Sequence, residues 1–235
     1  LSRLIWGDPY DETSAAQTRG ALERTVRHTA EISAADETGI RALLEALIDS
    51  GLSMLRFGQS HPASGAEHHL SHFWEMRLLL AGRPAILHGA KVGVGTVRVA
   101  RWYERVRALD REEARRRLAD APRHERTEEE AGIRAVYGPA ADDVIRRHGA
   151  FLDDAPAAHR ALGERILAAW DDIRAIAAEV PPAEDLAARL AAVGGPTTAD
   201  ALGIGEEEAA LAERYAHYLR PRFTVLKLAR RLGMM

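Results

Sequence analysis

Apolar residues recur three or four positions apart along nearly the whole chain of 235 residues. The segment that follows Asp36 is the clearest case, with apolar side chains at Ile40, Leu43, Leu44, Leu47 and Ile48. Because an α-helix turns once in about 3.6 residues, these side chains share one face that a core can cover. The pattern predicts an all-α fold, and Met54 and Phe57 are expected to be core residues where this helix continues.

Caps, prolines and glycines set the expected limits of the other helices. A first helix is expected to be capped by Thr13 or Ser14, to carry Leu22, Val26 and Ile32 on its apolar side and to end before Ala34. Further helices are expected after Asp110, from near Thr127, through Val144 and Ile145, over 157–180, over 206–218 and over 221–232. Arg220 and Arg222 lie between the last two, where they are expected to hold the C-terminal helices together.

The segment from His88 to Leu109 allows two interpretations. Its first half is dense in β-branched residues, which favours a strand. It is longer than most strands, so we predict a buried helix instead. Gly93 and Gly95 are expected to serve close backbone packing, because a dinucleotide-binding fingerprint needs a preceding strand and a third glycine.

Charge and composition narrow the class of protein. The 32 Lys and Arg residues against 35 Asp and Glu give a formal charge of −3, which argues against a nucleic-acid surface. The chain has no cysteine, which excludes disulfides and thiolate metal ligands. No apolar run reaches the roughly 18 residues of a membrane span, so we expect no membrane association and a cytoplasmic enzyme. One helical domain over 1–235 is expected, and 110–126 is where it could subdivide.

Three histidines suggest a metal site. His68 and His72 are four positions apart on a predicted helix, so their imidazoles point into one space, whereas His69 points elsewhere. A second helix, whose start is marked by Pro84, brings His88 just before a glycine. Neutral imidazole is a good ligand for zinc, nickel or iron. Such a pair also arises by chance in a chain with 10 histidines, so a structural role stays open.

The residues just before His68 suggest an anion site. Ser64 and Glu67 have the spacing of a capping box, which predicts a helix that begins at Gly65. The free amides of its first turn would face the histidines, and Ser60 and Ser64 could add hydroxyls to an anion hole. A metal beside an anion hole suggests a phosphorylated substrate, although an ordinary capped turn explains the same residues.

An ordered series of motifs runs from residue 51 to residue 96: Gly-x-Ser, Pro-Ala-Ser-Gly, Glu-His-x-x-Ser-His and His-Gly-x-x-Val-Gly. This series resembles the metal-site segment of sn-glycerol-1-phosphate dehydrogenases. Their superfamily also holds iron-dependent alcohol dehydrogenases, glycerol dehydrogenase and 3-dehydroquinate synthase. The resemblance extends from Leu1 to the C-terminus and corresponds to the C-terminal helical half of that architecture. It implies that an N-terminal nucleotide-binding domain is absent from this sequence.

The resemblance also implies roles for residues. His68 and His88 would bind a divalent metal together with an aspartate from upstream of Leu1. His72 would lie beside the substrate and relay protons. Ser64 would help to seat the substrate phosphate. His61 stands where the family has an arginine near the anionic group, and imidazole is a weaker, pH-dependent partner for phosphate. Lys91 and Arg56 are the residues that could compensate.

The implied activity interconverts dihydroxyacetone phosphate and sn-glycerol 1-phosphate with NAD or NADP, in a homo-oligomeric enzyme. The nicotinamide would deliver hydride to the carbonyl carbon. Two alternatives stay open: a dehydrogenase of an unphosphorylated polyol from the same superfamily, and a non-catalytic helical fragment that retains a vestigial site.

Overall fold

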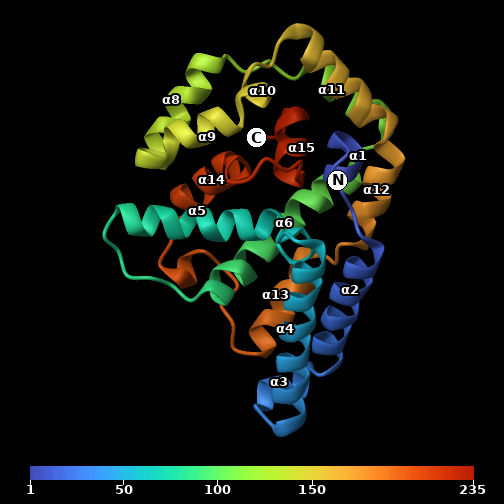
Figure 1. The fold of residues 1–235 in the computed structure, drawn as a ribbon, viewed down its shortest axis with the longest axis vertical. Helices are drawn as coiled ribbons and strands as arrows, with labels where there is room; N and C mark the ends of the chain where they lie inside the picture. The colour runs from blue at the N-terminus through green and yellow to red at the C-terminus, as the bar shows by residue number, and fades with distance from the viewer.

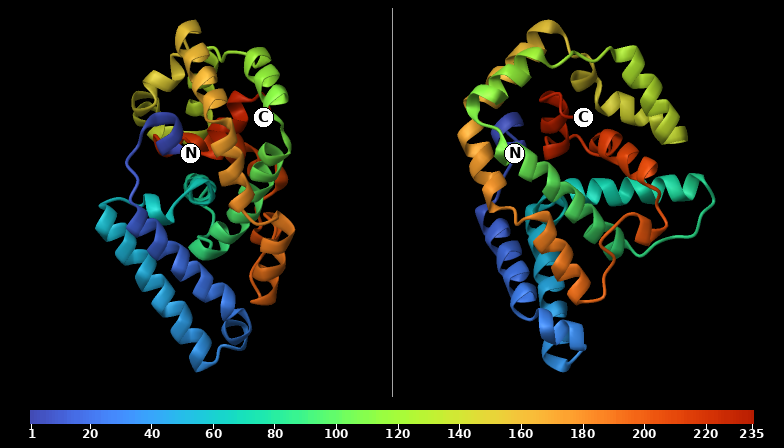
Figure 2. Two further views of the ribbon diagram at one scale, coloured as in Figure 1. Left: turned by 90° about the vertical axis from the view of Figure 1, so that its right-hand side faces the viewer. Right: turned by 180° about the vertical axis from the view of Figure 1, so that it is seen from behind.

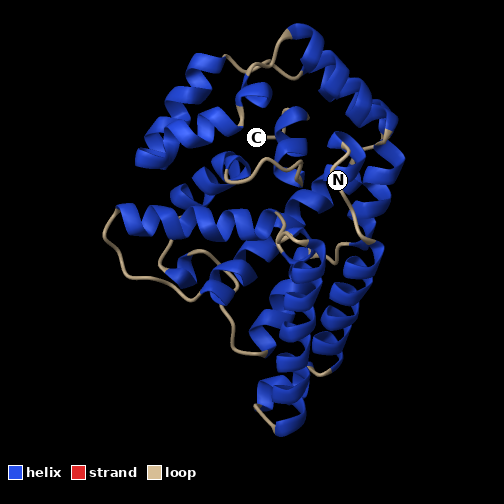
Figure 3. Ribbon diagram, viewed as in Figure 1, coloured by secondary structure: helices blue, strands red, loops and turns tan.

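The computed structural model describes all residues, Leu1–Met235, and consists of helices and connecting loops without strands (Figure 3). The all-α prediction is confirmed. The first six α-helices are α1 (Ser2–Trp6), α2 (Glu12–Arg27), α3 (Thr29–Ala34), α4 (Glu37–Phe57), α5 (Ala66–Leu80) and α6 (His88–Ala108). The next six are α7 (Arg111–Asp120), α8 (Arg126–Tyr137), α9 (Ala141–Arg147), α10 (Gly149–Leu152), α11 (Pro156–Ala168) and α12 (Trp170–Glu179). The last three are α13 (Ala183–Ala192), α14 (Glu206–Tyr215) and α15 (Val225–Arg231).

Four short 3-10 helices lie between them: η1 (His61–Ala63), η2 (Gly138–Ala140), η3 (Asp200–Leu202) and η4 (Ala216–Tyr218). No helix combines the length and the apolar character needed to cross a bilayer.

The helices form two regions that meet at α5 and α6 (Figure 1). At one end α2 and α4 lie side by side as a long hairpin with α3 at its tip, and α13 packs against α6 beside it (Figures 1 and 2). At the other end α8 to α12 form an arch around α14 and α15 (Figure 1). The helices α5 and α6, which carry His68, His72 and His88, thus run through the middle of the molecule.

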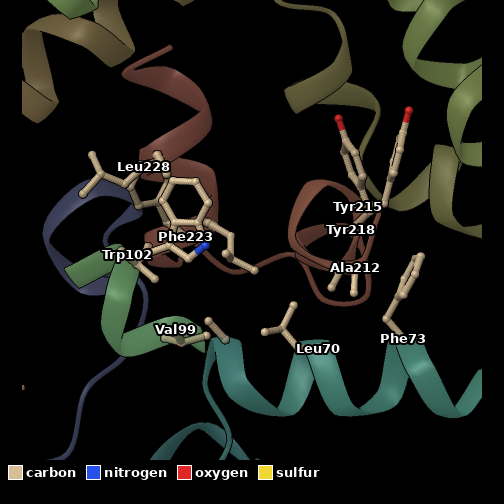
Figure 4. Close-up of a cluster of buried hydrophobic side chains, with 14 of the residues drawn as sticks. Leu70, Phe73, Val99, Trp102, Ala212, Tyr215, Tyr218, Phe223 and Leu228 are labelled. Atoms are coloured by element: carbon tan, nitrogen blue, oxygen red, sulfur yellow. The ribbon is translucent and has the colours of Figure 1, made fainter. Parts of the chain in front are cut away.

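The main core lies where α5 and α6 meet α14 and α15. Leu70 and Phe73 of α5 face Trp102 of α6 and Tyr218 of η4, and all four are buried (Figure 4). The same continuous core takes in residues on both sides of 110–126. The subdivision of the domain at 110–126 remains a prediction.

Glycines set the distance between α5 and α6. A Cβ atom at Gly95 would lie 2.7 Å from the Glu67 carbonyl oxygen, so only glycine allows α6 to approach the first turn of α5 this closely. A Cβ at Gly93 would lie 3.1 Å from a methyl group of Leu190 on α13. Both glycines therefore serve close packing, as predicted, and α6 is the predicted helix rather than a strand.

Several predicted helix limits were wrong. Asp11, not Thr13 or Ser14, caps α2 by accepting the Ser14 amide at 2.7 Å. The helix expected to begin at Pro84 begins four residues later, at His88, after a loop over residues 83–87. The long helix expected over 157–180 is two helices that break at Ala169.

The apolar face predicted for α4 exists, but it is not buried. Ile40, Leu44, Leu47 and Ile48 are between 42% and 61% exposed. The buried face of α4 instead carries the small residues Ala42, Ala46 and Ser53. Small side chains let α2 approach closely, and the Ser14 hydroxyl reaches the Ser53 carbonyl oxygen at 3.2 Å.

The residues predicted as core at the end of α4 are also only half-buried. Both Met54 and Phe57 lie at the surface in part.

Candidate metal centre

Three histidine rings meet where α5 faces the start of α6. His68 and His72 lie one turn apart on α5, with ring centroids 6.2 Å apart. His88, the first residue of α6, lies 5.3 Å from each of them. His69 lies on the buried side of α5, where it is 1% exposed. The structure thus brings together the three histidines that the sequence singled out.

Two features bring His88 to this position. The chain leaves α5 through Gly82, whose φ of +63° belongs to the left-handed region that favours glycine. A loop from Pro84 to Leu87 then returns to α5, and α6 begins at His88. The close approach at Gly95 holds the two helices together two turns further along.

Glu67 orients His68. The Nδ1 atom of His68 lies 2.8 Å from Glu67 Oε1, so Nδ1 donates to the carboxylate and Nε2 is left as the free acceptor. Burial on its own raises the pKa of Glu67, but hydrogen bonds from His68 and from the Gly65 amide outweigh it and the pKa is lowered. A carboxylate behind an imidazole fixes the ring and raises its basicity, as in many metal-ligating histidines.

The predicted capping box is wrong in detail. The N-cap of α5 is Gly65, and Glu67 accepts from the Gly65 amide at 2.7 Å instead of reaching back to Ser64. A carboxylate therefore already occupies the start of this helix. An anion would have to bind beside it, nearer to Ser64 and the preceding η1.

Glu75 is a candidate ligand that the sequence analysis missed. One ligand atom each of His72, Glu75 and His88 lies within 4.8 Å of the others. Glu75 Oε2 is 3.6 Å from His72 Nδ1 and 3.5 Å from the ammonium of Lys91, a lysine that is only 1% exposed. The signal was present in the sequence, because Glu75 follows His72 by three positions and so shares its face.

This donor set fits a divalent transition metal. Imidazole nitrogens and carboxylate oxygens suit zinc, nickel and iron, and ligation requires the imidazole to be neutral. Burial, and next the neighbouring His88, lower the pKa of His72 and favour its neutral form. Two ligand sets are available: His68 with His88 and a carboxylate from elsewhere, or His72, Glu75 and His88. His88 belongs to both.

The residues predicted to bind phosphate lie beside this cluster in sequence. His61 begins η1, with its ring centroid 5.4 Å from that of Phe57. Burial, and then the charge of Arg222, lower the pKa of His61, so a protonated imidazole is disfavoured there. The guanidinium of Arg222 donates to the Ser64 carbonyl oxygen at 2.7 Å and to the Ser60 hydroxyl at 3.0 Å.

Arg222 is therefore a cation at this segment that the sequence analysis had assigned only to the C-terminal helices. Lys91 is buried against Glu75, and Arg56 is exposed on α4. The position of Arg222 follows from a contact between residues 158 positions apart, which no local pattern signals.

The fold and the donor cluster define an all-α domain with a candidate transition-metal site, and sequence comparison identifies its relatives. No family model matches the chain. A glycerol-1-phosphate dehydrogenase [NAD(P)+] from Halalkalibacterium halodurans is 35% identical over 226 residues, which are 96% of this chain and 46% of the relative. The enzyme of the same name from Bacillus subtilis is 34% identical over 97% of this chain and 45% of the relative. One from Pyrococcus furiosus is 39% identical over 43% of the chain and 28% of the relative.

The chain is thus related in sequence to the glycerol-1-phosphate dehydrogenases over nearly its whole length, as the motifs of residues 51–96 indicated. It spans about half the length of the curated relatives it matches.

Proposed function

We propose that this chain forms the metal-binding and substrate-binding part of an oxidoreductase that interconverts dihydroxyacetone phosphate and sn-glycerol 1-phosphate with NAD or NADP. The observation that carries the proposal is the convergence of His68, His72 and His88, with ring centroids 5.3–6.2 Å apart. The names of its relatives supply the reaction and the nicotinamide cofactor. Because the chain spans about half of each relative, the activity belongs to this chain together with the counterpart of the remaining half.

His68 and His88 would hold the metal. The Glu67 carboxylate already fixes the proton of His68 on Nδ1, which leaves Nε2 to ligate. The third ligand of this set would be a carboxylate outside the chain, whereas the alternative set takes Glu75 and His72 from within it. When bound, the metal would supply Lewis acidity that polarises the substrate carbonyl and stabilises the developing alkoxide.

His72 would relay the proton that this reaction needs. Its side chain is 45% exposed, so it can meet both substrate and solvent. Glu75 faces its Nδ1 at 3.6 Å and can orient the ring. General acid catalysis of this kind needs a group within hydrogen-bond reach of the reacting oxygen, and the side chain of His72 opens on the same space as the metal-binding histidines. The nicotinamide cofactor would supply the hydride.

His61, Ser64 and Arg222 would recognise the substrate phosphate. The guanidinium is permanently charged and forked, which suits phosphate better than the neutral His61. Its hydrogen bonds to the 60–64 segment tie it to the loop that precedes the metal helix. This arrangement supports a phosphorylated substrate even though an arginine is missing at position 61.

We also propose that the working enzyme covers the exposed leucines of α4 with another polypeptide surface, as in a homo-oligomer. Leu44 is 54% exposed, Leu47 61% and Leu55 77%. A contiguous apolar helix face of this kind is typical of interfaces rather than of free surface.

The test is a fusion of this chain to the part of the Halalkalibacterium relative that it does not match. We expect the fusion to oxidise NADH or NADPH with dihydroxyacetone phosphate and not with dihydroxyacetone. Arg222→Gln should raise KM for the phosphorylated substrate, while Arg220→Gln, at an exposed neighbouring position, should not. Turnover of the unphosphorylated ketone alone would contradict the proposed substrate and favour a polyol dehydrogenase. A folded fusion that turns over neither ketone would favour the vestigial site.

A further inference from the structure

A second candidate site lies in the arch, away from the histidine cluster. The helices α8 to α11 lie around the C-terminal α15 (Figure 1). Residues from these helices line a cavity of about 540 Å³. None of its lining residues belongs to the candidate metal centre. Part of the wall is aromatic, formed by Trp6, Phe151 and Tyr218. The volume is within the range of about 300–1,000 Å³ that is usual for small-molecule sites.

The lining of this cavity carries a surplus of positive charge. It contains four arginines and two carboxylates, so its formal charge is 4 − 2 = +2 with the histidines neutral. Both carboxylates are already engaged. Glu129 pairs with Arg230 and accepts the Tyr218 hydroxyl at 2.8 Å. Asp154 accepts from His159 Nδ1 at 2.8 Å and from the His124 amide at 3.1 Å.

Two of the four arginines form no ion pair, although the Asp154 carboxylate acts on Arg231 from a longer distance. Arg231 is 4% exposed, and it donates one hydrogen bond, to the His159 carbonyl oxygen at 2.9 Å. Its Nε and one terminal nitrogen are buried and have no partner. Arg165, at the exposed rim, donates to the Ile5 carbonyl oxygen at 2.8 Å and forms no ion pair.

An unpaired guanidinium in a buried position is costly, because the charge loses its hydration and gains no counter-charge. Buried polar groups without partners are uncommon in folded proteins, and each one calls for an explanation such as a bound ion. Each of the two arginines is fixed by a backbone carbonyl while its other N–H groups remain available. Such a fork suits the paired oxygens of a carboxylate or a phosphate.

We propose that this cavity binds a small organic anion, whose oxyanion group bonds Arg231 and Arg165 and whose apolar body rests against Trp6, Phe151 and Tyr218. The ligand class is a carboxylate or phosphate monoester that carries an aromatic or alkyl group. His148 also lines the cavity, and burial followed by the charge of Lys227 lowers its pKa to about 3, so it adds no positive charge at neutral pH. The attraction for the anion rests with the arginines.

The test is isothermal titration calorimetry of the full chain with phenyl phosphate, benzoate and inorganic phosphate. We expect phenyl phosphate or benzoate to bind with a stoichiometry of one and inorganic phosphate to bind at least tenfold more weakly, because it lacks the apolar body. Comparison of the two aromatic anions tells which oxyanion the site prefers. Arg231→Gln should weaken binding by roughly tenfold or more, the loss of a charge-assisted pair of hydrogen bonds.

A second variant keeps the Arg231 guanidinium and fills the cavity with a larger side chain. Ala161 lines the cavity from the exposed side of α11, so Ala161→Phe should abolish binding. Ala157→Phe is the matched control, because residue 157 is exposed on the same helix and does not line the cavity. If Arg231→Gln does not fold, the comparison of Ala161→Phe with Ala157→Phe still tests the proposal. Arg222→Gln should leave binding unchanged, which separates this cavity from the phosphate site proposed beside the histidines.

Three results would overturn the proposal. The first is no binding of either aromatic anion at millimolar concentration. The second is equal affinity in the folded wild-type and Ala161→Phe chains. The third is binding that Arg222→Gln abolishes and Ala161→Phe does not change, which would place the anion at the metal centre.

Discussion

His148 makes a measurable prediction about the pH dependence of stability. It lies at the junction of α9 and α10, 3% exposed, with its ring edge-on to Tyr218 at a centroid distance of 5.2 Å. Its Nε2 is buried without a partner. Burial, and next the charge of Lys227, lower its pKa from the ordinary 6.5 to about 3.

The direction in which stability changes with pH follows from the difference in proton binding between the folded and the unfolded chain. The unfolded chain binds a proton at His148 below pH 6.5, whereas the folded chain binds it only near pH 3. The contribution of a neutral His148 to stability is therefore fully present above pH 6.5 and is lost progressively as the pH falls toward 3. At a pH 1.5 units below the unfolded pKa the loss amounts to about 2 kcal/mol for this one residue.

Urea unfolding at about pH 8 and about pH 5 tests this reasoning. His148→Gln removes the titrating group, so the variant should lose about 2 kcal/mol less stability than the wild type between the two pH values. The other buried histidines, His69, His159 and His217, are present in both proteins, so the difference between the two pH profiles reports the loss of His148. Arg146→Gln, on the exposed side of α9, serves as a control because it leaves His148 and its buried surroundings in place. An unchanged pH dependence in His148→Gln would refute the reasoning.

Three further predictions concern packing, backbone strain and substrate recognition. Gly95→Ala places a Cβ against the backbone oxygen of Glu67 and should lower the free energy of unfolding in urea by about 1–3 kcal/mol, whereas Gly89→Ala, which meets no atom within 4 Å, should not. Ala35 has φ +52° and ends α3 in the left-handed region, so Ala35→Gly should raise the free energy of unfolding by about 1 kcal/mol. In the fusion enzyme, Arg222→Gln should raise KM for dihydroxyacetone phosphate by roughly tenfold or more, because a charge-assisted hydrogen bond is lost.

The sequence was sufficient for the class of fold and for the three histidines. Both depend on local spacing: apolar residues at helical intervals predict helices, and positions 68 and 72 must share a face of one of them. For the segment after His88, its length predicted a helix and its β-branched residues favoured a strand. The prediction from length was correct. That His88 lies beside His68 and His72 was predicted from the family motif that spans both segments. Helical periodicity alone could not predict it.

Periodicity could not tell which helix face is buried. On α4 the larger residues Leu44 and Leu47 are exposed, while Ala42 and Ala46 are buried, because small side chains let neighbouring helices approach this face closely. The break at Ala169 also has no local signal, since neither proline nor glycine occurs there.

The sequence did not reveal the roles of residues whose contacts join distant parts of the chain. Arg222 meets Ser60 and Ser64 through the tertiary structure alone. Glu75 shares a face with His72, yet its pairing with the buried Lys91 depends on how α6 packs on α5. The unpaired Arg231 likewise becomes informative only when its surroundings are known.

The most direct test of the central claim is the zinc content of the fusion enzyme after dialysis, compared among wild type, His88→Ala, His68→Ala and Glu75→Gln. We predict about one zinc per wild-type chain, almost none in His88→Ala and His68→Ala, and a retained zinc in Glu75→Gln. Loss of zinc in Glu75→Gln but not in His68→Ala would shift the site to His72, Glu75 and His88. A folded His88→Ala variant that keeps its full zinc content would contradict the metal centre proposed for this cluster.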